Sequence, residues 1–383
     1  MKSILKKIEL CFFILFCFIF LSCGQSQSSK AFTAMNTFMT ISLYSQSSKK
    51  GNEACSQIEK RIKEIENIIS TTLPSSELYS INNRDINESG NHGTANYESN
   101  YESNYKSNYE AYYPLQKNNE ITELLDFSFF IYQKTDGAFN PALYPIIREW
   151  GFTTEKYKVP SQQRINELLL KTDFNKIKFD GEQILIPQGM ELDFGAVGKG
   201  YAADEALLIL EKNGIKSALL DFGGNIQAVG SKPDGTLWRV GIKNPWENGV
   251  VCALKVASKA VVTSGGYERF FEDENGNRYI HIFDPVSGSP CQSDLESVTI
   301  VCNSGKYADA LSTSLFVMGK EKAVDWWKKM NAAEAFSEGQ MEEYSFDFIF
   351  ITKDHKLIYS QGLKDSIEPL YPFASIELVK VTR

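Results

Sequence analysis

The feature that most constrains the fold is a series of short strands with no helix between them. Alternating apolar residues and turn signals predict this series at 217–222, 225–230, 237–242, 252–264, 278–284 and 296–302. Parallel neighbours need a crossover of about a dozen residues or more, and most of these gaps are shorter. The sequence therefore predicts an α+β fold with mixed, largely antiparallel sheets and packed helices, rather than a doubly wound parallel sheet.

The rest of the chain supplies helices and flanking strands. Apolar residues at helical spacing predict helices over 53–70, 119–135, 199–213 and 307–330, the last with a break near Gly319. A strand is expected at 31–45, and hairpins are expected at 176–194 and 346–360.

The first 23 residues are typical of a targeting segment. Three lysines precede an apolar run over 11–21 that is too short for a comfortable membrane span. The run ends in Leu21-Ser22-Cys23, which resembles a bacterial lipoprotein processing site; ordinary cleavage and an uncleaved anchor are the alternatives. We expect a signal peptide over 1–22, lipidation of Cys23 and a tether over 23–30. The lipid would hold the protein on the inner membrane, facing the periplasm.

A repetitive stretch interrupts the domain expected over 31–383. Residues 83–118 are of low complexity, and a tetrapeptide that begins Asn-Tyr occurs four times over 96–111. Four residues are too few for a solenoid unit, and Asn and Ser are poor helix formers. We interpret the stretch as a solvated loop insertion; a tyrosine patch that binds a partner is the alternative.

Composition argues against two kinds of site. The net charge of −8 is unfavourable for a broad nucleic-acid surface, so no nucleic-acid partner is expected. The four cysteines that follow Cys23 have no zinc-ligand spacing, and the sequence leaves open whether any two form a disulfide. An acidic protein that acts on a polyanion usually requires a bound cation.

Two segments carry residues suited to phosphate and metal. The segment LDFGAVGKG (192–200) leads from an expected strand through a glycine-rich turn into a helix, which offers backbone amides and the Lys199 charge to a phosphate. In ADALST (308–313), a helix places Asp309 and Thr313 on one face with Ser312 beside them, and such oxygens can hold Mg²⁺. A tight turn with a surface lysine, and an N-cap with solvated hydroxyls, are the respective alternatives.

His281 differs from the other two histidines in its surroundings. His92 lies in the repetitive stretch and His355 in a polar turn, whereas His281 lies among aromatic and aliphatic residues. A side chain that titrates near neutrality suits proton transfer. A hydrogen-bonded core histidine is the alternative.

Taken together, these segments resemble the ApbE family of lipoprotein FAD:protein FMN transferases. The matching motifs occur in family order: Met35-Asn36-Thr37, GAFNP (137–141), WGF (150–152), LDFGAVGKGYAAD (192–204), DFGGN (221–225), TSGGYERF (263–270), HIFDPVSG (281–288) and ADALSTSLFVMG (308–319). The resemblance implies an ApbE-like, T-fold-related architecture. It also implies Mg²⁺-dependent transfer of the FMN moiety of FAD to a Ser or Thr hydroxyl of a client membrane redox protein, with release of AMP.

The resemblance further implies roles for individual residues. The metal ligands would be the Ala196 carbonyl and the side chains of Asp309 and Thr313, with Ser312 adjacent. The residues that contact FAD would be Met35, Thr72, Ala138, Phe139, Asn140, Asp193, Lys199, Ser264, Gly265, His281 and Phe283. We hypothesise that Lys199 and Mg²⁺ neutralise the pyrophosphate and that His281 is the base, with Asp309 as the competing candidate.

Three departures from the family pattern leave alternatives open. Many relatives carry an aromatic residue at position 72, and Thr72 leaves the nucleotide more open to water. Mg²⁺-dependent hydrolysis of FAD to FMN and AMP is therefore the first alternative, and a flavin-binding lipoprotein without turnover is the second. Asn36 replaces a glycine and can keep a left-handed turn; Gly266 replaces an acid, with unknown effect.

Overall fold

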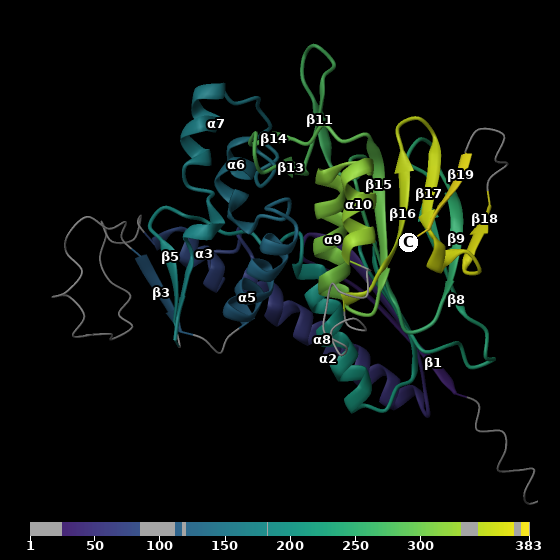
Figure 1. The fold of residues 1–383 in the computed structure, drawn as a ribbon. Coiled ribbons are helices and arrows are strands. Elements are labelled where there is room, and N and C mark those ends of the chain that lie inside the picture. The colour runs from purple at the N-terminus through teal and green to yellow at the C-terminus, as the bar shows by residue number, and fades with distance from the viewer. Residues whose placement is uncertain are drawn as a thin grey trace, which may run out of the picture.

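A nine-stranded sheet forms the centre of the molecule (Figure 1). The computed structural model describes residues 25–84, 112–116, 120–181, 183–330, 344–370 and 377–382. The strand order is β1-β2-β6-β7-β10-β15-β16-β17-β19, and every neighbouring pair is antiparallel except β17 and β19. The predicted α+β class with largely antiparallel pairing is confirmed.

The strands of this sheet are short, as the turn signals predicted. They are β1 (Ser26–Ala34), β2 (Thr37–Ser45), β6 (Ser217–Phe222), β7 (Asn225–Val229), β10 (Ala260–Gly265), β15 (Leu295–Cys302), β16 (Asp347–Thr352), β17 (Lys356–Ser360) and β19 (Glu377–Val381). Alternate residues face opposite sides of the sheet, so Val262 packs under the helices whereas Val261 packs toward the other face.

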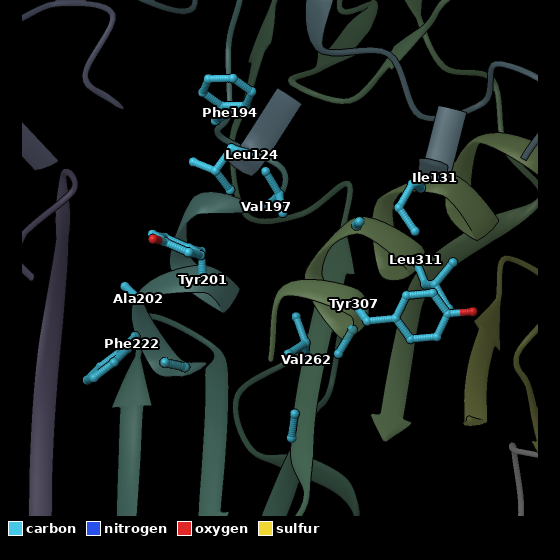
Figure 2. Packing of buried hydrophobic residues seen from close by; sticks show 14 of the residues in the cluster. Leu124, Ile131, Phe194, Val197, Tyr201, Ala202, Phe222, Val262, Tyr307 and Leu311 are labelled. Atoms are coloured by element: carbon cyan, nitrogen blue, oxygen red, sulfur yellow. The ribbon is translucent and has the colours of Figure 1, made fainter. Parts of the chain in front are cut away.

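Helices cover one face of the sheet. They are α2 (Ser48–Ile69), α8 (Gly198–Lys212), α9 (Gly305–Met318) and α10 (Lys320–Met330). Figure 2 shows side chains of α8 and α9, among them Tyr201 and Leu311, in one buried cluster with Phe222 and Val262 of the sheet. The helices predicted over 53–70, 199–213 and 307–330 are confirmed, and Gly319 (φ 74°) separates α9 from α10.

A small sheet covers the opposite face. Its strands are β8 (Trp238–Lys243), β9 (Val250–Val256) and β18 (Ile367–Pro369), and η3 (Gln361–Leu363) precedes β18. Trp238 and Leu254 of this sheet share a second buried cluster with Ile349 of β16. No helix in the described part of the chain is both long and apolar enough to cross a membrane.

A further group of elements flanks the helical layer. It comprises α3 (Glu77–Asn82), β3 (Tyr112–Gln116), α5 (Glu120–Lys134), η1 (Pro141–Leu143), α6 (Tyr144–Glu149), α7 (Gln162–Leu169), η2 (Phe174–Lys176), β4 (Lys178–Asp180), β5 (Gln183–Pro187), and the hairpins β11 (Phe270–Glu272) with β12 (Arg278–Ile280) and β13 (Phe283–Asp284) with β14 (Ser289–Pro290). The β11–β12 hairpin projects at the top of Figure 1. The helix predicted over 119–135 is confirmed as α5.

Two predicted strands are each split by a left-handed turn that contains no glycine. The segment 31–45 is not one strand, because Met35 (φ 49°) and Asn36 (φ 54°) turn the chain between β1 and β2. The segment 252–264 is likewise divided into β9 and β10 at Ser258 (φ 48°). Asn36 keeps the left-handed turn that its residue type allows, whereas Ser258 gave no such signal, because non-glycine residues rarely adopt these angles.

Three other expectations also change. Strand β1 begins at Ser26, inside the segment expected to be a tether over 23–30. The second strand of the hairpin predicted at 176–194 ends at Pro187, so the residues before the glycine-rich turn are not a strand. Strand β3 occupies 112–116 of the stretch interpreted as a loop, and the tetrapeptide repeat at 96–111 lies outside the described residues.

Helices α8 and α9 approach each other closely near their N-termini. A Cβ added to Gly200 would meet the backbone of Gly305, with the carbonyl carbon at 2.5 Å and the Lys306 nitrogen at 2.7 Å. Asp204, one turn further along α8, caps α9 by accepting hydrogen bonds from the N–H groups of Gly305 (2.6 Å) and Lys306 (3.1 Å). This contact fixes the position of α9 along the axis of α8.

Gly200→Ala is expected to destabilise the fold by about 2 kcal/mol or more, because rigid backbone atoms occupy the space that the methyl group needs. Calorimetric unfolding measures the change. Leu208→Ala, at an exposed position of the same helix, is the matched control. A Gly200→Ala protein that melts with the wild type would show that the two helices can separate at no cost.

Candidate functional site

Several turns meet at one end of the nine-stranded sheet. The β1–β2 turn at 35–36, the β6–β7 turn at 223–224 and the end of β10 at Gly265 share this end, as the antiparallel register requires. The first two turns touch through Thr37, which lies against Gly223. Helix α8 begins beside them. The motifs singled out in the sequence are therefore brought together from distant parts of the chain.

The Asp309 carboxylate is a buried charge at this end of the sheet. The residue is 4% exposed, and its Oδ2 accepts a hydrogen bond from the Gly200 N–H at 3.0 Å. Burial raises the pKa of Asp309, while the Lys199 charge and the amides at the start of α8 lower it. The pKa of Asp309 is raised overall. The Lys199 charge and the hydrogen-bond donors therefore offset the cost of burying the negative carboxylate only in part.

Three hydroxyls lie next to Asp309 where β10 meets α9. The Oγ of Ser264 is 2.8 Å from the Oγ of Ser312 and 3.2 Å from Oγ1 of Thr313. Ser312 also donates to the backbone carbonyl of Asp309 at 2.9 Å. The helical spacing predicted for these residues is confirmed, and a strand adds one more hydroxyl.

These donors suit Mg²⁺ better than a metal that prefers nitrogen or sulfur. In the part of the chain that the structure describes, no group of three or more His, Cys, Asp or Glu side chains could hold a metal ion. The group at Asp309 is instead one carboxylate with neutral oxygens, and Mg²⁺ completes such a set with water and substrate phosphate. The cysteines Cys55, Cys252, Cys291 and Cys302 are buried and free.

Asn225 is a site residue that sequence reasoning missed. It is 1% exposed, and neither of its amide atoms has a hydrogen-bond partner among the described residues. The amide faces the Asp309 carboxylate and lowers its pKa, without the geometry of a full hydrogen bond. A buried amide without a partner is costly, so its oxygen and nitrogen fit a place that a bound group completes.

Glu268 is a second residue that was missed. Its Oε1 lies 3.9 Å from the position that a Cβ on Gly224 would take. Burial raises the pKa of Glu268, the charges of Lys199 and Lys243 lower it, and Asp309 raises it. Asn225 and Glu268 both lie in matched motifs, but a motif does not say which of its side chains approach Asp309.

His281 lies in a bend between β12 and β13, not within one strand over 278–284 as expected. The Arg269 carbonyl accepts the His281 backbone N–H at 3.1 Å and lies 3.1 Å from the ring Nδ1. If Nδ1 carries the proton, Nε2 keeps a lone pair for accepting another. Burial, with the charges of Arg269 and Lys199, lowers the pKa of His281 to about 4, so the ring is neutral at pH 7.

This pKa predicts a pH dependence of stability. The ordinary pKa of histidine is 6.5, and in the folded protein the pKa of His281 is about 4. Between these two pH values the unfolded chain binds more protons at His281 than the folded chain does. Stability contributed by the neutral ring is therefore lost as the pH falls through this window. His281→Asn is expected to lose less stability than the wild type between pH 7 and pH 4.5 in urea unfolding, with His355→Asn in an exposed turn as control. Equal losses in all three proteins would contradict the assignment.

Three residues expected to contact FAD direct their side chains elsewhere. Phe139 is buried in the main cluster, and Phe283 packs edge-on against Phe152 at a centroid distance of 5.7 Å. The Asn140 amide caps η1 by accepting from Ala142 N–H at 2.9 Å. The side chains of Phe139, Asn140 and Phe283 thus pack or hydrogen-bond within the protein, and their contact with FAD stays a prediction.

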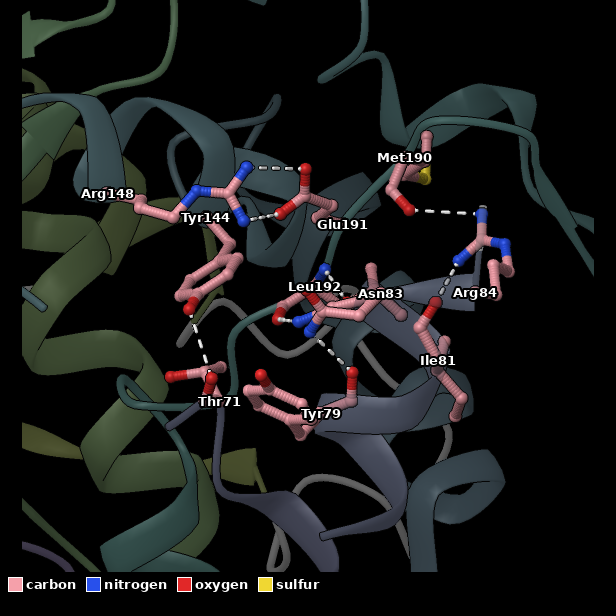
Figure 3. Close-up of polar contacts among 11 residues, drawn as sticks. Thr71, Tyr79, Ile81, Asn83, Arg84, Tyr144, Arg148, Met190, Glu191 and Leu192 are labelled. Atoms are coloured by element: carbon pink, nitrogen blue, oxygen red, sulfur yellow. Dashed lines mark hydrogen bonds and ion pairs between the residues drawn. The ribbon is translucent and has the colours of Figure 1, made fainter. Parts of the chain in front are cut away.

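The loop that carries Thr72 is fixed by Tyr144 (Figure 3). The Tyr144 hydroxyl donates to the Thr71 carbonyl at 3.0 Å, and Ser70 Oγ accepts the N–H groups of Thr72 at 3.2 Å and Leu73 at 3.1 Å. Thr72 itself is exposed. The backbone of this loop is thus held by hydrogen bonds, and position 72, where the resemblance led us to expect an aromatic ring, offers a small polar side chain.

The segment that leads to Asp193 is also held by polar contacts. Leu192, labelled in Figure 3, exchanges two backbone hydrogen bonds of 2.8 Å with the Asn82 side chain. Asp193 accepts the Gly195 N–H at 2.6 Å; burial raises its pKa, and the Gly195 amide and Arg269 charge lower it. Met35 lies in the β1–β2 turn, Ala138 is half-buried after α5, and Ala196 is half-buried before α8.

Comparison with known proteins adds three findings. The ApbE family model matches residues 35–337. The chain is 34% identical over 275 residues to the FAD:protein FMN transferase of Treponema pallidum (strain Nichols), covering 67% of this chain and 72% of that one. It is 32% identical over 240 residues to the FAD:protein FMN transferase of Klebsiella pneumoniae (strain 342), covering 61% and 70%.

Solved structures share the fold. The ApbE protein of Thermotoga maritima superposes with a TM-score of 0.68 at 27% identity, covering 91% of this chain and 98% of that one. The flavin transferase ApbE of Vibrio cholerae has a TM-score of 0.70 at 22% identity, covering 89% and 99%. The arrangement of sheets and helices described above is therefore common to these proteins.

Proposed function

Because this chain belongs to the ApbE family, we propose that it is an Mg²⁺-dependent FAD:protein FMN transferase. It would move the FMN moiety of FAD to a Ser or Thr hydroxyl of a client protein and release AMP. The observation that carries the proposal is the convergence of the Asp309 carboxylate, its neighbouring hydroxyls and the Lys199 helix start, with His281 close to Lys199.

The metal would be held by the residues named from the resemblance. The Ala196 carbonyl and the side chains of Asp309 and Thr313 are the proposed ligands, with Ser312 adjacent. The incompletely compensated charge of Asp309 and the unpartnered amide of Asn225 support this assignment. When bound, the ion supplies positive charge to the pyrophosphate oxygens.

The chain's own residues account for the movement of the proton. The acceptor oxygen forms a bond to the FMN-side phosphorus as the bond from that phosphorus to the bridging oxygen breaks, and AMP leaves with the bridging oxygen. The proton of the acceptor hydroxyl passes to Nε2 of His281. An anionic substrate beside His281 would raise its pKa and so favour this transfer. Lys199 and the first amides of α8 would bind the phosphate charge.

Hydrolysis of FAD is the second candidate function, and the exposed Thr72 favours it. Without an aromatic ring at this position, water can reach the nucleotide and take the place of the client hydroxyl. The same residues would serve both reactions, so they differ only in the acceptor.

One incubation separates the candidates. The purified protein is mixed with FAD and Mg²⁺, with and without a client domain, and AMP, free FMN and protein-bound FMN are quantified. Covalent FMN on the client supports the transferase. Free FMN in equal amount with and without client supports the hydrolase. Bound FAD that is never cleaved would leave a flavin-binding protein.

The location of the protein is part of the same proposal. Lipid on Cys23 would anchor the protein to the bacterial inner membrane, on the periplasmic side, where membrane redox proteins could serve as clients. Labelling cells with a fatty-acid probe, in the wild type and in Cys23→Ala, tests this anchor.

A further inference from the structure

The folded domain begins very close to the proposed lipid. Only Gly24 and Gln25 lie between Cys23 and Ser26, where β1 starts and pairs with Ser45 at the end of β2. Three residue steps span at most about 10 Å. A lipid on Cys23 would therefore hold this end of the sheet within about 10 Å of the bilayer. The end of the sheet at Ser26 and Ser45 is thus the anchored end of the molecule.

The candidate site lies at the opposite end of the same strand. Strand β1 has nine residues and ends at Ala34, directly before the turn at the site. At about 3.3 Å per residue this strand covers about 30 Å. Helix α2 runs the same way: Gly51 lies against Ser28 near the start of β1, and Glu66 accepts the Met35 N–H at 2.6 Å at the far end.

Helix α8 runs in the reverse direction and brings its C-terminus to the anchored end. It begins at the site, beside Asp309, and ends at Lys212. The next residues return beside the start of α2, since the Lys50 Nζ lies 3.9 Å from the position of a Cβ on Gly214. In Figure 1 the starts of β1 and α2 and the end of α8 lie together at the lower edge.

Lysines gather at this anchored end, at the start of α2, at the end of α8 and on two connections. They are Lys49, Lys50, Lys212, Lys216 and Lys259, and we call them the lysine end. Lys216 and Lys259 belong to it because Gly230 lies against the Lys216 carbonyl and Ala228 N–H donates to the Lys259 carbonyl at 2.9 Å.

The charge of the lysine end opposes that of the whole chain. Its five lysines lie with two acids at the same ends of α2 and α8, Glu53 and Glu211, whereas the whole chain carries a net charge of −8. Hydrogen bonds, and then the charge of the nearby Lys232, act on Asp234 and lower the pKa of that carboxyl. No ion pair joins a lysine of this group to a carboxylate of the described residues. Such a patch fits an anionic surface.

We propose that the lysine end lies on an anionic phospholipid surface and that the candidate site faces away from it, about 30 Å above the headgroups. The proposal rests on the anchor at Cys23. The Debye length is about 8 Å in physiological salt, so the short connection to Ser26 is what keeps the lysines within reach of the lipid charge. A client would then have to present its hydroxyl well above the bilayer, on a domain and not at the membrane surface.

Energy transfer from two positions tests the orientation. The full chain is placed in nanodiscs of phosphatidylcholine, with or without phosphatidylglycerol, that contain a headgroup-linked acceptor dye. A donor dye is attached at Gln46→Cys, exposed at the anchored end, or at Val286→Cys, 86% exposed and a few residues after His281. We expect strong transfer from position 46 and at least about fivefold weaker transfer from position 286. Equal transfer from both would overturn the proposal.

Charge reversal tests the lipid contact separately. Replacing Lys49, Lys50, Lys212 and Lys216 by Glu is expected to raise transfer from position 286 in phosphatidylglycerol discs, because without the lysine contact the molecule can tilt about its short anchor. The matched control is the double variant Lys156→Glu with Lys171→Glu. Both lysines are exposed; one precedes α7 and the other follows it. Identical transfer in the reversed and wild-type proteins would refute the lipid contact. Because no flavin chemistry is measured, this outcome is independent of the proposed transferase activity.

Discussion

Replacing Asp309 by Ala is expected to lower FMN transfer and FAD cleavage by about 10³-fold or more. Asp309 is the one carboxylate proposed to hold the metal, and it is buried against the start of α8. Charge stabilisation by a bound ion contributes several kcal/mol to a transition state, and about 4 kcal/mol corresponds to about 10³-fold. AMP release from FAD at saturating Mg²⁺ measures the loss.

A binding measurement separates this role from a structural one. Asp309→Asn keeps the shape and the hydrogen bond from Gly200, and it should be as inactive as Asp309→Ala. Mn²⁺ titration followed by electron paramagnetic resonance should show a bound ion in the wild type and in Asp325→Ala, an exposed control, but not in either Asp309 variant. Normal metal binding by Asp309→Asn would remove Asp309 from the ligand set.

Replacing His281 by Ala is expected to lower transfer by about 10²-fold while FAD binding is retained. The ring is neutral at pH 7, and with Nδ1 protonated toward the Arg269 carbonyl it presents Nε2 as a base. Loss of that base slows the step in which the acceptor hydroxyl gives up its proton. Single-turnover transfer to a client domain measures the rate, and flavin fluorescence measures binding.

The competing base gives a clear contrary outcome. If Asp309 took the proton, His281→Ala would transfer FMN at the wild-type rate, and the assignment of His281 would fail. His355→Ala is the matched control, because this histidine lies in the exposed β16–β17 turn. A loss of FAD binding in His281→Ala would instead indicate that the ring positions the nucleotide.

The elements that sequence reasoning predicted well have strong local periodicity. The buried isoleucines of α2 recur at helical spacing, and the strands of 217–229 alternate between two covered faces. Two of the segments that it mispredicted, 31–45 and 252–264, depend on a few backbone angles. Met35, Asn36 and Ser258 adopt left-handed conformations that only the surrounding structure stabilises, as when Glu66 accepts the Met35 N–H.

The candidate site shows the same difference between what local spacing predicts and what only the surrounding structure decides. Helical spacing alone placed Asp309 and Thr313 on one face, the glycine-rich turn indicated Lys199, and the resemblance supplied the role of His281 as the base. Spacing could not reveal that Asn225 turns toward Asp309 without a hydrogen-bond partner. It also could not reveal that Phe139 and Phe283 turn into the core, because both residues lie in motifs that suggested ligand contact.

By itself, the sequence determined the fold class, the family and the types of chemical group available, since periodicity and motif order are properties of the chain. Only the tertiary structure decided which of those groups meet. The meeting of α8 with α9 at Gly200, and the ends of β1, β6 and β10, bring residues from 35 to 313 together. Such contacts depend on packing between distant segments, and local spacing contains no information about them. The same packing places the start of β1 and the candidate site at opposite ends of one sheet.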